Sequence, residues 1–161
     1  MKIALASDHA GFTLKEAVKA LMKTQGHETV DFGTNGELSV DYPDFGFPAA
    51  EAVAKGQCNF GIFVCGSGIG MSMLANKVTG IRAALCTSVT MAEMSRSHNN
   101  ANVLILGQRI TDRTTALEIV KVWLSTPFEG GRHQRRIDKI AAYERRTPYP
   151  GPQESERSVI C

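Results

Sequence analysis

The sequence has few of the features that mark several large classes of protein. Its 161 residues include only four cysteines. None of them shows CxxC spacing, which argues against a zinc site or a disulfide framework and favours reduced thiols. No apolar run approaches the roughly 20 residues of a membrane span, and no signal peptide is visible at the N-terminus. We therefore expect a cytoplasmic protein that does not enter a membrane.

The charge is close to balanced, with 18 Lys and Arg against 16 Asp and Glu and a net charge of +2. This balance gives no reason to expect nucleic acid as a partner. Apolar residues make up 43% of the chain, as in an ordinary soluble globule. The length suits a single domain over residues 1–146. The polar, proline-containing remainder, residues 147–161, is expected to be a flexible tail.

Short apolar runs alternate with amphipathic runs along the chain. The runs predict strands at Ile3–Ser7, Glu28–Phe32, Phe60–Cys65, Ile81–Cys86 and Val103–Leu106. The amphipathic segments predict helices at Thr13–Gln25, Asp44–Lys55, Ile69–Val78, Ser88–Ser97, Asp112–Leu124 (after Thr111 as N-cap) and Arg132–Arg146. This order predicts a doubly wound, Rossmann-like α/β fold with a five-stranded parallel sheet, helices on both faces and an extra C-terminal helix.

The most informative segment begins with Cys65 at the end of an apolar strand. Three glycines follow within five residues, and a helical pattern begins close behind them. A strand, a tight loop and a helix start turn free backbone N–H groups toward an anion. The cysteine would then place a base or nucleophile beside a site that stabilises negative charge. The alternative is a packing cysteine followed by an ordinary glycine turn.

Other chemically useful groups follow the neighbouring predicted strands. Asp8 and His9 come after the first strand, and Arg109 comes after the fifth. Sites in open α/β sheets form beyond the carboxyl ends of the strands, so these groups are expected at one edge with Cys65. Taken singly, Asp8 could be a helix cap, His9 a loop residue and Arg109 a surface charge.

Two further segments carry polar groups. His98 opens a run of asparagines between a helix and a strand; turn chemistry explains the asparagines but not the imidazole, which suits proton transfer near neutral pH. Arg132 and Arg136 are four residues apart, so they share a helix face and could bind a phosphate. The alternatives for this pair are a solvated basic face or a nucleic-acid patch, and the absence of interleaved aromatics disfavours the patch.

Together these segments resemble the type B ribose-5-phosphate isomerase family, which includes the subunits of galactose-6-phosphate isomerase. The resemblance runs in order from Met1 to about Arg146. The matching motifs are Asp8-His9-Ala10-Gly11, Asp41-Tyr42-Pro43, Cys65-Gly66-Ser67-Gly68-Ile69-Gly70, Ala75-Asn76-Lys77, Gly80-Ile81-Arg82-Ala83, His98-Asn99-Asn100-Ala101-Asn102, Gly107-Gln108-Arg109 and Gly130-Gly131-Arg132-His133-Gln134.

The resemblance implies interconversion of ribose 5-phosphate and ribulose 5-phosphate, a step of the pentose phosphate pathway, with no cofactor or metal. By this resemblance Cys65 moves the proton between C2 and C1 through a cis-enediolate, and His98 opens the furanose ring with help from Asp8. Ser67 stands where many relatives have threonine. The residues implied to hold the sugar oxygens, or to line the pocket, are Tyr42, Gly66, Ser67, Gly68, Ile69, Gly70 and Asn99. Those implied to hold the phosphate are His9, Arg109, Arg132 and Arg136.

The order of the segments also predicts an assembly. Cys65 follows a strand, whereas His98 precedes one and Arg132 opens a helix after the chain has returned. These groups should lie at opposite edges of the sheet, too far apart for the ~3 Å contacts of proton transfer. We therefore expect a homodimer, or a tetramer, whose active site is completed across the interface.

Three alternatives remain open at this stage. The same chemistry could act on galactose 6-phosphate or allose 6-phosphate, because one extra hydroxymethyl group is a small discrimination. Cys65 and His98 could instead serve a hydrolase or acyl transferase as nucleophile and base. The loop could also belong to a non-catalytic phosphate-binding module, although it lacks a full G-x-G-x-x-G or P-loop pattern.

Overall fold

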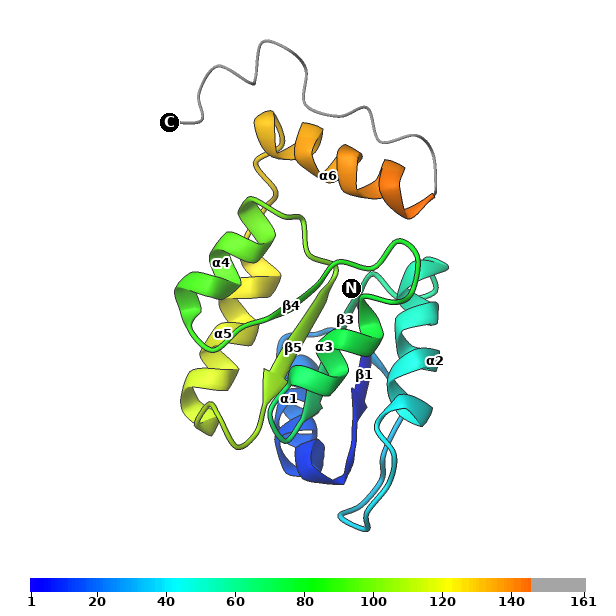
Figure 1. Cartoon of the computed structure of the whole chain (residues 1–161). Coiled ribbons are helices and arrows are strands. Elements are labelled where there is room, and N and C mark those ends of the chain that lie inside the picture. Colours follow the sequence, from blue (N-terminus) through cyan, green and yellow to red (C-terminus); the bar gives the residue numbers. More distant parts are fainter. Residues whose placement is uncertain (146–161) are drawn as a thin grey trace.

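The computed structural model describes residues 1–145, and the expected tail at 147–161 lies outside this part of the chain. As predicted, five parallel strands form one sheet (Figure 1). Their order, which was not predicted, is β2-β1-β3-β5-β4. The strands are β1 (Lys2–Ser7), β2 (Glu28–Asp31), β3 (Phe60–Cys65), β4 (Ala83–Leu85) and β5 (Val103–Gly107).

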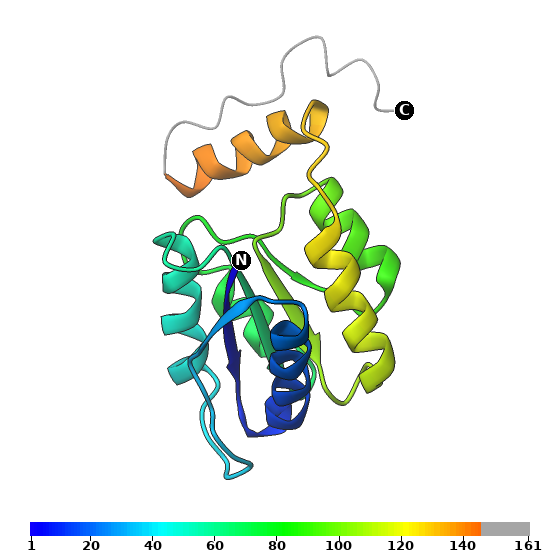
Figure 2. The ribbon, with the colours of Figure 1, turned by 180° about the vertical axis from the view of Figure 1, so that it is seen from behind.

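In the part of the chain that the structure describes, six α-helices accompany the sheet, together with a 3-10 turn over His9–Gly11. They are α1 (Phe12–Thr24), α2 (Pro43–Ala54), α3 (Ile69–Ala75), α4 (Val89–Ser97), α5 (Arg113–Ser125) and α6 (Arg132–Glu144). Helices α1, α4 and α5 cover one face of the sheet, and α2 and α3 cover the other (Figures 1 and 2). Within residues 1–145, no helix combines the length and apolar character needed to cross a bilayer.

Alternate strand residues feed two separate cores. On β1, Ile3 and Leu5 point into the core shared with α1, α4 and α5, whereas Ala4 and Ala6 point into the core shared with α2 and α3. This alternation follows from the two-residue period of a strand and makes both faces apolar. The sheet is therefore fixed between two buried layers, and its strand ends are rigid supports for loops.

The structure corrects two details of the predicted elements around the third helix and fourth strand. Helix α3 ends at Ala75 instead of Val78, and β4 spans only Ala83–Leu85 instead of Ile81–Cys86. The side chain of Asn76 explains both, because its amide accepts from the N–H of Ala83 at 2.9 Å and donates to the Ala83 carbonyl at 3.0 Å. An asparagine that pairs with a strand in this way stops the helix and orders the connection.

The predicted cap of the fifth helix was wrong by one residue. Asp112, not Thr111, caps α5, and its Oδ1 accepts from the N–H of Thr115 at 3.0 Å. The Thr111 hydroxyl is buried with no hydrogen-bond partner. Asp is as good an N-cap as Thr or better, so the local sequence permitted either residue.

Helix α6 lies beyond the amino ends of the strands, apart from the two helical layers (Figures 1 and 2). It is held at three places. Its own side chain Ile137 is buried against the rest of the protein. The N–H of Gly80 donates to Glu144 Oε2 at 2.9 Å, and the N–H of Glu129, just before the helix, donates to the Ser97 carbonyl at 3.0 Å. These contacts attach both ends of α6 to the loops at this edge of the sheet.

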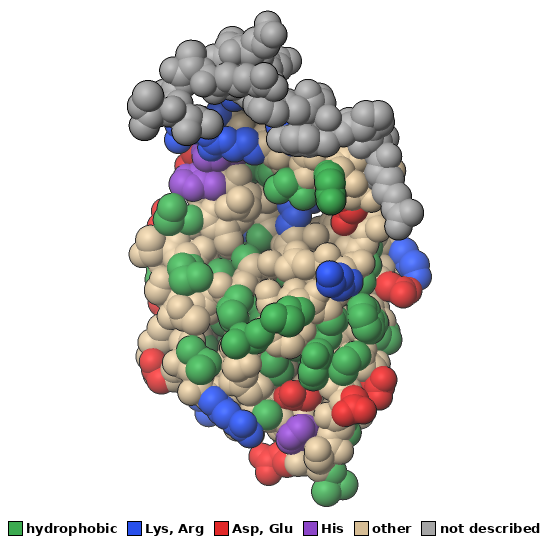
Figure 3. All heavy atoms as spheres, in the orientation of Figure 1, with side chains coloured by type: hydrophobic (Ala, Val, Ile, Leu, Met, Phe, Trp, Pro, Cys, Tyr) green, Lys and Arg blue, Asp and Glu red, His purple; other side chains and the backbone are tan. Residues whose placement is uncertain are grey.

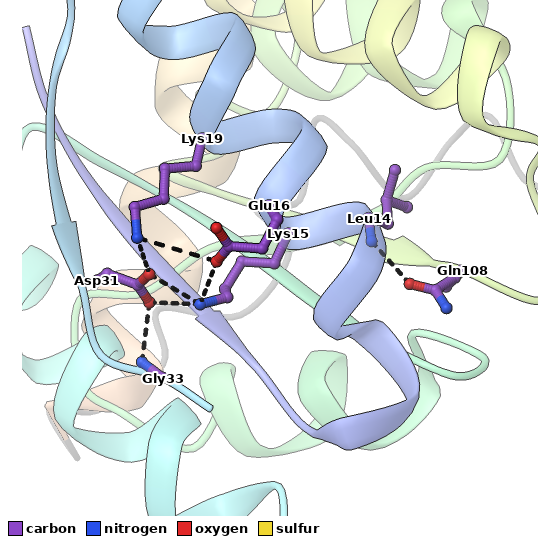
Figure 4. A network of polar contacts seen from close by, with 7 residues as sticks. All are labelled: Leu14, Lys15, Glu16, Lys19, Asp31, Gly33 and Gln108. Carbon is purple, nitrogen blue, oxygen red and sulfur yellow. Dashed lines mark hydrogen bonds and ion pairs between the residues drawn. The ribbon is translucent and has the colours of Figure 1, made fainter. Parts of the chain in front are cut away.

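A network of charged side chains ties α1 to the end of β2 (Figure 4). The Lys15 ammonium is fully buried, donates to both oxygens of Asp31 at 2.8 Å and lies 3.0 Å from Glu16. Lys19 Nζ donates to Asp31 at 2.6 Å, and the N–H of Gly33 donates to the same carboxylate at 3.0 Å. Burial raises the pKa of Asp31, but the hydrogen bonds from Lys15, Lys19 and Gly33 outweigh it, so the pKa is lowered.

Replacing Asp31 by Asn should lower the free energy of unfolding by about 3 kcal/mol near neutral pH, because a buried ammonium loses its main partner. Since the folded pKa of Asp31 is lowered, this stabilisation is present above the ordinary carboxyl pKa and is lost as the pH falls through the folded value. Urea unfolding at a series of pH values measures the difference.

The matched control is Glu51→Gln, which breaks an exposed i,i+4 pair with Lys55. It should cost less than about 0.5 kcal/mol. Equal losses for the two variants, or a loss for Asp31→Asn that persists unchanged in acid, would contradict the role given to the network.

Candidate active site

A cavity of about 410 Å³ lies at the carboxyl edge of the sheet. Its volume is within the range of small-ligand pockets. Its lining includes Asp8, His9, Ala10, Tyr42, Cys65, Gly66, Ser67, Gly70, Arg109 and Ile110. The groups expected at this edge therefore do come together, and Ala10 and Ile110 are lining residues that sequence reasoning did not single out.

The loop after β3 wraps around the sulfur of Cys65. The side chain is buried, and its Sγ accepts from the N–H of Gly68 at 3.1 Å. The hydroxyl of Ser67 accepts from the N–H of Ile69 at 3.3 Å. Gly68 is left-handed (φ +79°), and a Cβ there would overlap the Leu85 side chain. The tight turn therefore needs glycine at this position, as the glycine-rich pattern indicated.

Asp8 and His9 enter the cavity from the end of β1. Asp8 is buried and caps the short 3-10 turn, its Oδ1 accepting from the N–H of Gly11 at 3.0 Å. His9 Nδ1 accepts from the N–H of Val40 at 3.2 Å. Because Nδ1 is an acceptor, the neutral ring carries its proton on Nε2, which leaves a donor for a ligand. The cap that was the alternative for Asp8 is thus present, together with a place in the cavity.

Arg109 and Tyr42 close two sides of the cavity. The backbone N–H of Arg109 donates to the Gly66 carbonyl at 2.9 Å, so the arginine and the cysteine loop are joined directly. Tyr42 immediately precedes α2, and its ring lies against Gly70, where an added Cβ would come within 2.8 Å of the ring. Arg109 is exposed, so its charge is free to meet a ligand at the mouth of the cavity.

The other predicted site residues do not line this cavity. His98 ends α4 on the side of the sheet where β5 begins, and Arg132 and Arg136 lie exposed on α6 beyond that edge (Figures 1 and 2). Asn99 is exposed and lines a different cavity, of about 420 Å³, beneath α6. One copy of the chain therefore carries two separate groups of candidate residues, as the topological argument predicted.

The asparagines near His98 stabilise the turn between α4 and β5. Asn100 adopts a left-handed conformation (φ +46°), in line with the turn chemistry expected of it. Its side chain accepts from Arg96 at 3.0 Å, and Asn102 Oδ1 accepts from the N–H of Arg82 at 2.8 Å. His98 itself stacks on His133, a contact that sequence reasoning missed because it depends on where α6 lies.

The family model and the relatives that match this chain define its class, and the chain is a sugar-phosphate isomerase. It belongs to the ribose/galactose isomerase family, whose model matches residues 3–140. Ribose-5-phosphate isomerase B of Escherichia coli is 44% identical over 145 residues, which cover 90% of this chain and 97% of the relative.

Solved structures agree with the sequence comparison. Ribose-5-phosphate isomerase B of Clostridium thermocellum superposes with a TM-score of 0.89 at 53% identity, covering 91% of this chain and 99% of that one. The enzyme of Mycoplasma genitalium, determined with ribulose 5-phosphate bound, gives a TM-score of 0.87 at 47% identity and covers 91% of this chain and 97% of that one. The family resemblance and the fold class expected from the sequence are confirmed.

Gly70→Ala should displace Tyr42 from the cavity, because the added methyl group would overlap its ring. We expect kcat/KM for the sugar phosphate to fall about tenfold, or ~1.4 kcal/mol, with a small change in melting temperature. Gly36→Ala is the matched control, because a Cβ there meets nothing within 4 Å. Equal activity in the two variants would show that the Tyr42 ring has no part in the site.

Proposed function

We propose that the chain interconverts D-ribose 5-phosphate and D-ribulose 5-phosphate, the aldose–ketose step of the pentose phosphate pathway, in the cytoplasm. The observation that carries the proposal is the Cys65 sulfur, held by the Gly68 N–H inside a cavity that also presents Asp8, His9 and Arg109. The Mycoplasma genitalium relative with ribulose 5-phosphate bound supports the choice of sugar. Free thiols at Cys58, Cys65 and Cys86 agree with a reducing compartment.

In the proposed chemical step Cys65 is the base. Its thiolate takes the proton from C2 of the open-chain aldose, and the electron pair of that bond moves to form the cis-enediolate as O1 becomes an oxyanion. The thiol then returns the proton to C1, while the hydroxyl proton on O2 is transferred to O1. The Gly68 N–H donates to the sulfur, and we assign the other backbone N–H groups of the Gly66–Gly70 loop and the Ser67 hydroxyl to the enediolate, because donors placed beside a base stabilise developing negative charge.

Ribose 5-phosphate is mostly a closed furanose ring, so a second group must open it. We assign this proton transfer to His98, with Asp8 at the anomeric hydroxyl. Asp8 is in the cavity and His98 is at the other edge of the sheet. Because a proton donor must come within hydrogen-bond reach, the imidazole has to come from a second copy of the chain.

The residues that bind the phosphate are divided between the two copies in the same way. His9 offers its Nε2 proton and Arg109 its guanidinium within the cavity. Arg132 and Arg136 of the partner subunit would complete the grip, with Asn99 of the partner subunit on the sugar hydroxyls. Guanidinium groups suit phosphate because they donate two parallel hydrogen bonds. The phosphate would then bridge the two copies.

A partly apolar face is available for such a dimer. Hydrophobic side chains gather in the middle of the surface over α3 (Figure 3). The exposed apolar residues on α3 and α4 are Ile69, Met73, Met91 and Met94. Gathered apolar surface is typical of protein–protein contacts. We propose that a second copy covers this face and places its α6 over the open cavity.

The substrate is tested by proton NMR of the purified chain in heavy water with a chelator present. We expect ribose 5-phosphate to give ribulose 5-phosphate with deuterium at C1, the mark of an enediolate in contact with solvent. Conversion of galactose 6-phosphate or allose 6-phosphate, with no action on ribose 5-phosphate, would overturn the substrate and keep the family. A trapped thioester and no exchange at carbon would instead point to a cysteine hydrolase.

Cys65→Ala should lower kcat by about 10³-fold, the usual contribution of a general base, and leave the melting temperature nearly unchanged. Cys58→Ala is the control, because Cys58 is also buried but does not line the cavity. Steady-state kinetics with ribose 5-phosphate compare the two. Retained turnover in Cys65→Ala, or an equal loss in both variants, would remove Cys65 as the base. Phosphate binding without turnover in the wild type, unchanged in Cys65→Ala, would instead favour a non-catalytic phosphate-binding module.

A further inference from the structure

The imidazole rings of His98 and His133 form a parallel stack at the edge of the sheet where α6 begins. Their centroids are 4.4 Å apart and their planes differ by 7°. The His133 side chain is only 10% exposed, whereas that of His98 is 33% exposed. The His133 ring is thus buried in the protein, and the His98 ring stacks on it and is partly exposed to solvent.

A carboxylate faces both rings. Glu129 Oε2 lies 3.9 Å from His98 Nε2 and 3.7 Å from His133 Nε2. The segment that carries Glu129 is attached to α4, because its backbone N–H donates to the Ser97 carbonyl at 3.0 Å. The N–H of His133 in turn donates to the Gly130 carbonyl at 3.0 Å. Backbone hydrogen bonds therefore connect the segments that carry His98, Glu129 and His133.

The charges around His133 favour its neutral form. Burial lowers the pKa of His133 most, and the nearby His98, Arg132 and Arg136 lower it further, while Glu129 acts in the opposite sense. These are the charged groups that face His133 from α4, from the preceding loop and from its own helix. A neutral ring beneath His98 avoids placing two positive charges in a stack.

Two histidines and a glutamate also resemble a metal-ligand set, and their ligand atoms lie within 4.8 Å of one another. The geometry of the rings speaks against a shared ion. The lone pair of an imidazole nitrogen lies in the ring plane, and two nearly parallel planes do not meet at one point between the nitrogens. A metal would require one ring to turn out of the stack.

We propose that His133, with Glu129, is a positioning residue that holds the His98 imidazole in the orientation needed for ring opening. The proposal rests on the proposed role of His98 as the ring-opening acid. His133 supplies a fixed aromatic surface, and the Glu129 carboxylate, 3.9 Å from His98 Nε2, marks the side toward which that nitrogen points.

The same arrangement links the acid to the phosphate site. Arg132 immediately precedes His133 in α6, and Arg136 follows about one helical turn later. Phosphate bound by these arginines would fix the start of α6. Because His133 lies in this segment and stacks on His98, the orientation of the His98 ring would be fixed as well. Substrate without a phosphate should therefore lose ring opening as well as affinity.

The test compares His133→Asn and His133→Phe in the full-length protein. Asn removes the ring, and Phe keeps a flat surface under His98 without a titratable nitrogen. Two reactions are measured: turnover of ribose 5-phosphate, which needs ring opening, and exchange of the C1 proton of ribulose 5-phosphate in heavy water. Ribulose 5-phosphate is acyclic, because its O5 carries the phosphate, so its exchange needs only Cys65 chemistry.

For His133→Asn we expect kcat with ribose 5-phosphate to fall about tenfold or more, a part of the 10²–10⁴-fold typical of general acid catalysis. KM and the C1 exchange rate should stay within about twofold of the wild type, because the phosphate grip and Cys65 are intact. His133→Phe should recover most of the lost kcat. His27→Asn, a histidine outside both groups of candidate residues, is the matched control and should change neither reaction.

Three results would overturn the proposal. They are an unchanged kcat in His133→Asn, an equal fall of turnover and exchange, and a failure of His133→Phe to recover activity while its melting temperature is normal. A loss of wild-type activity on adding a chelator, with zinc restoring it, would favour the metal instead. His98→Asn separates the two levels: if it keeps full turnover, the proposed role of His98 fails, whereas an inactive His98→Asn beside a normal His133→Asn rejects only the positioning role.

Discussion

The parallel register of β1, β3 and β5 decides where the chemistry of this protein can occur. Ser7 pairs with Val64, and Cys65 pairs with Gly107, so the three strands end at the same level. The loops that follow these strands therefore begin side by side. The N–H of Gln108 donates to the Cys65 carbonyl at 2.9 Å, which joins two of these loops. The carboxylate, thiol and guanidinium of the cavity are brought together by backbone pairing, and the sheet is packed between two apolar cores.

The same topology places the second group of candidate residues out of reach of the first. A parallel sheet returns the chain to its amino edge after each strand, and His98 and α6 lie on that return side. The distance between the two edges is a property of the fold and cannot be closed by moving side chains. The proposed reaction needs both groups, which is why we propose a site shared between two copies.

The elements that could be predicted from the sequence are those set by periodicity and turn residues. Five strands, six helices, the Cys65 loop and the gathering of Asp8, Cys65 and Arg109 at one edge all follow from local pattern plus the rule for parallel sheets, and the structure confirms them. The ends of α3 and β4 could not be predicted, because they depend on Asn76 pairing with a strand seven residues away.

Contacts between distant segments also could not be predicted from the sequence. Lys15 sits in an amphipathic helix as if exposed, yet it is fully buried against Asp31. The stack of His98 on His133 arises only when α6 folds back over the end of α4. Both are charged or titratable groups whose environment is made by another element, which periodicity cannot reveal.

The most direct measurement of the central claim is complementation between two inactive variants. Cys65→Ala and His98→Ala chains are mixed in equal amounts under conditions where subunit exchange is verified, and turnover of ribose 5-phosphate is measured. If the site is shared, half of the dimers are mixed and each mixed dimer has one intact site, so activity should return to about a quarter of the wild-type value. No recovery, with exchange verified, would show that one copy of the chain carries the whole site.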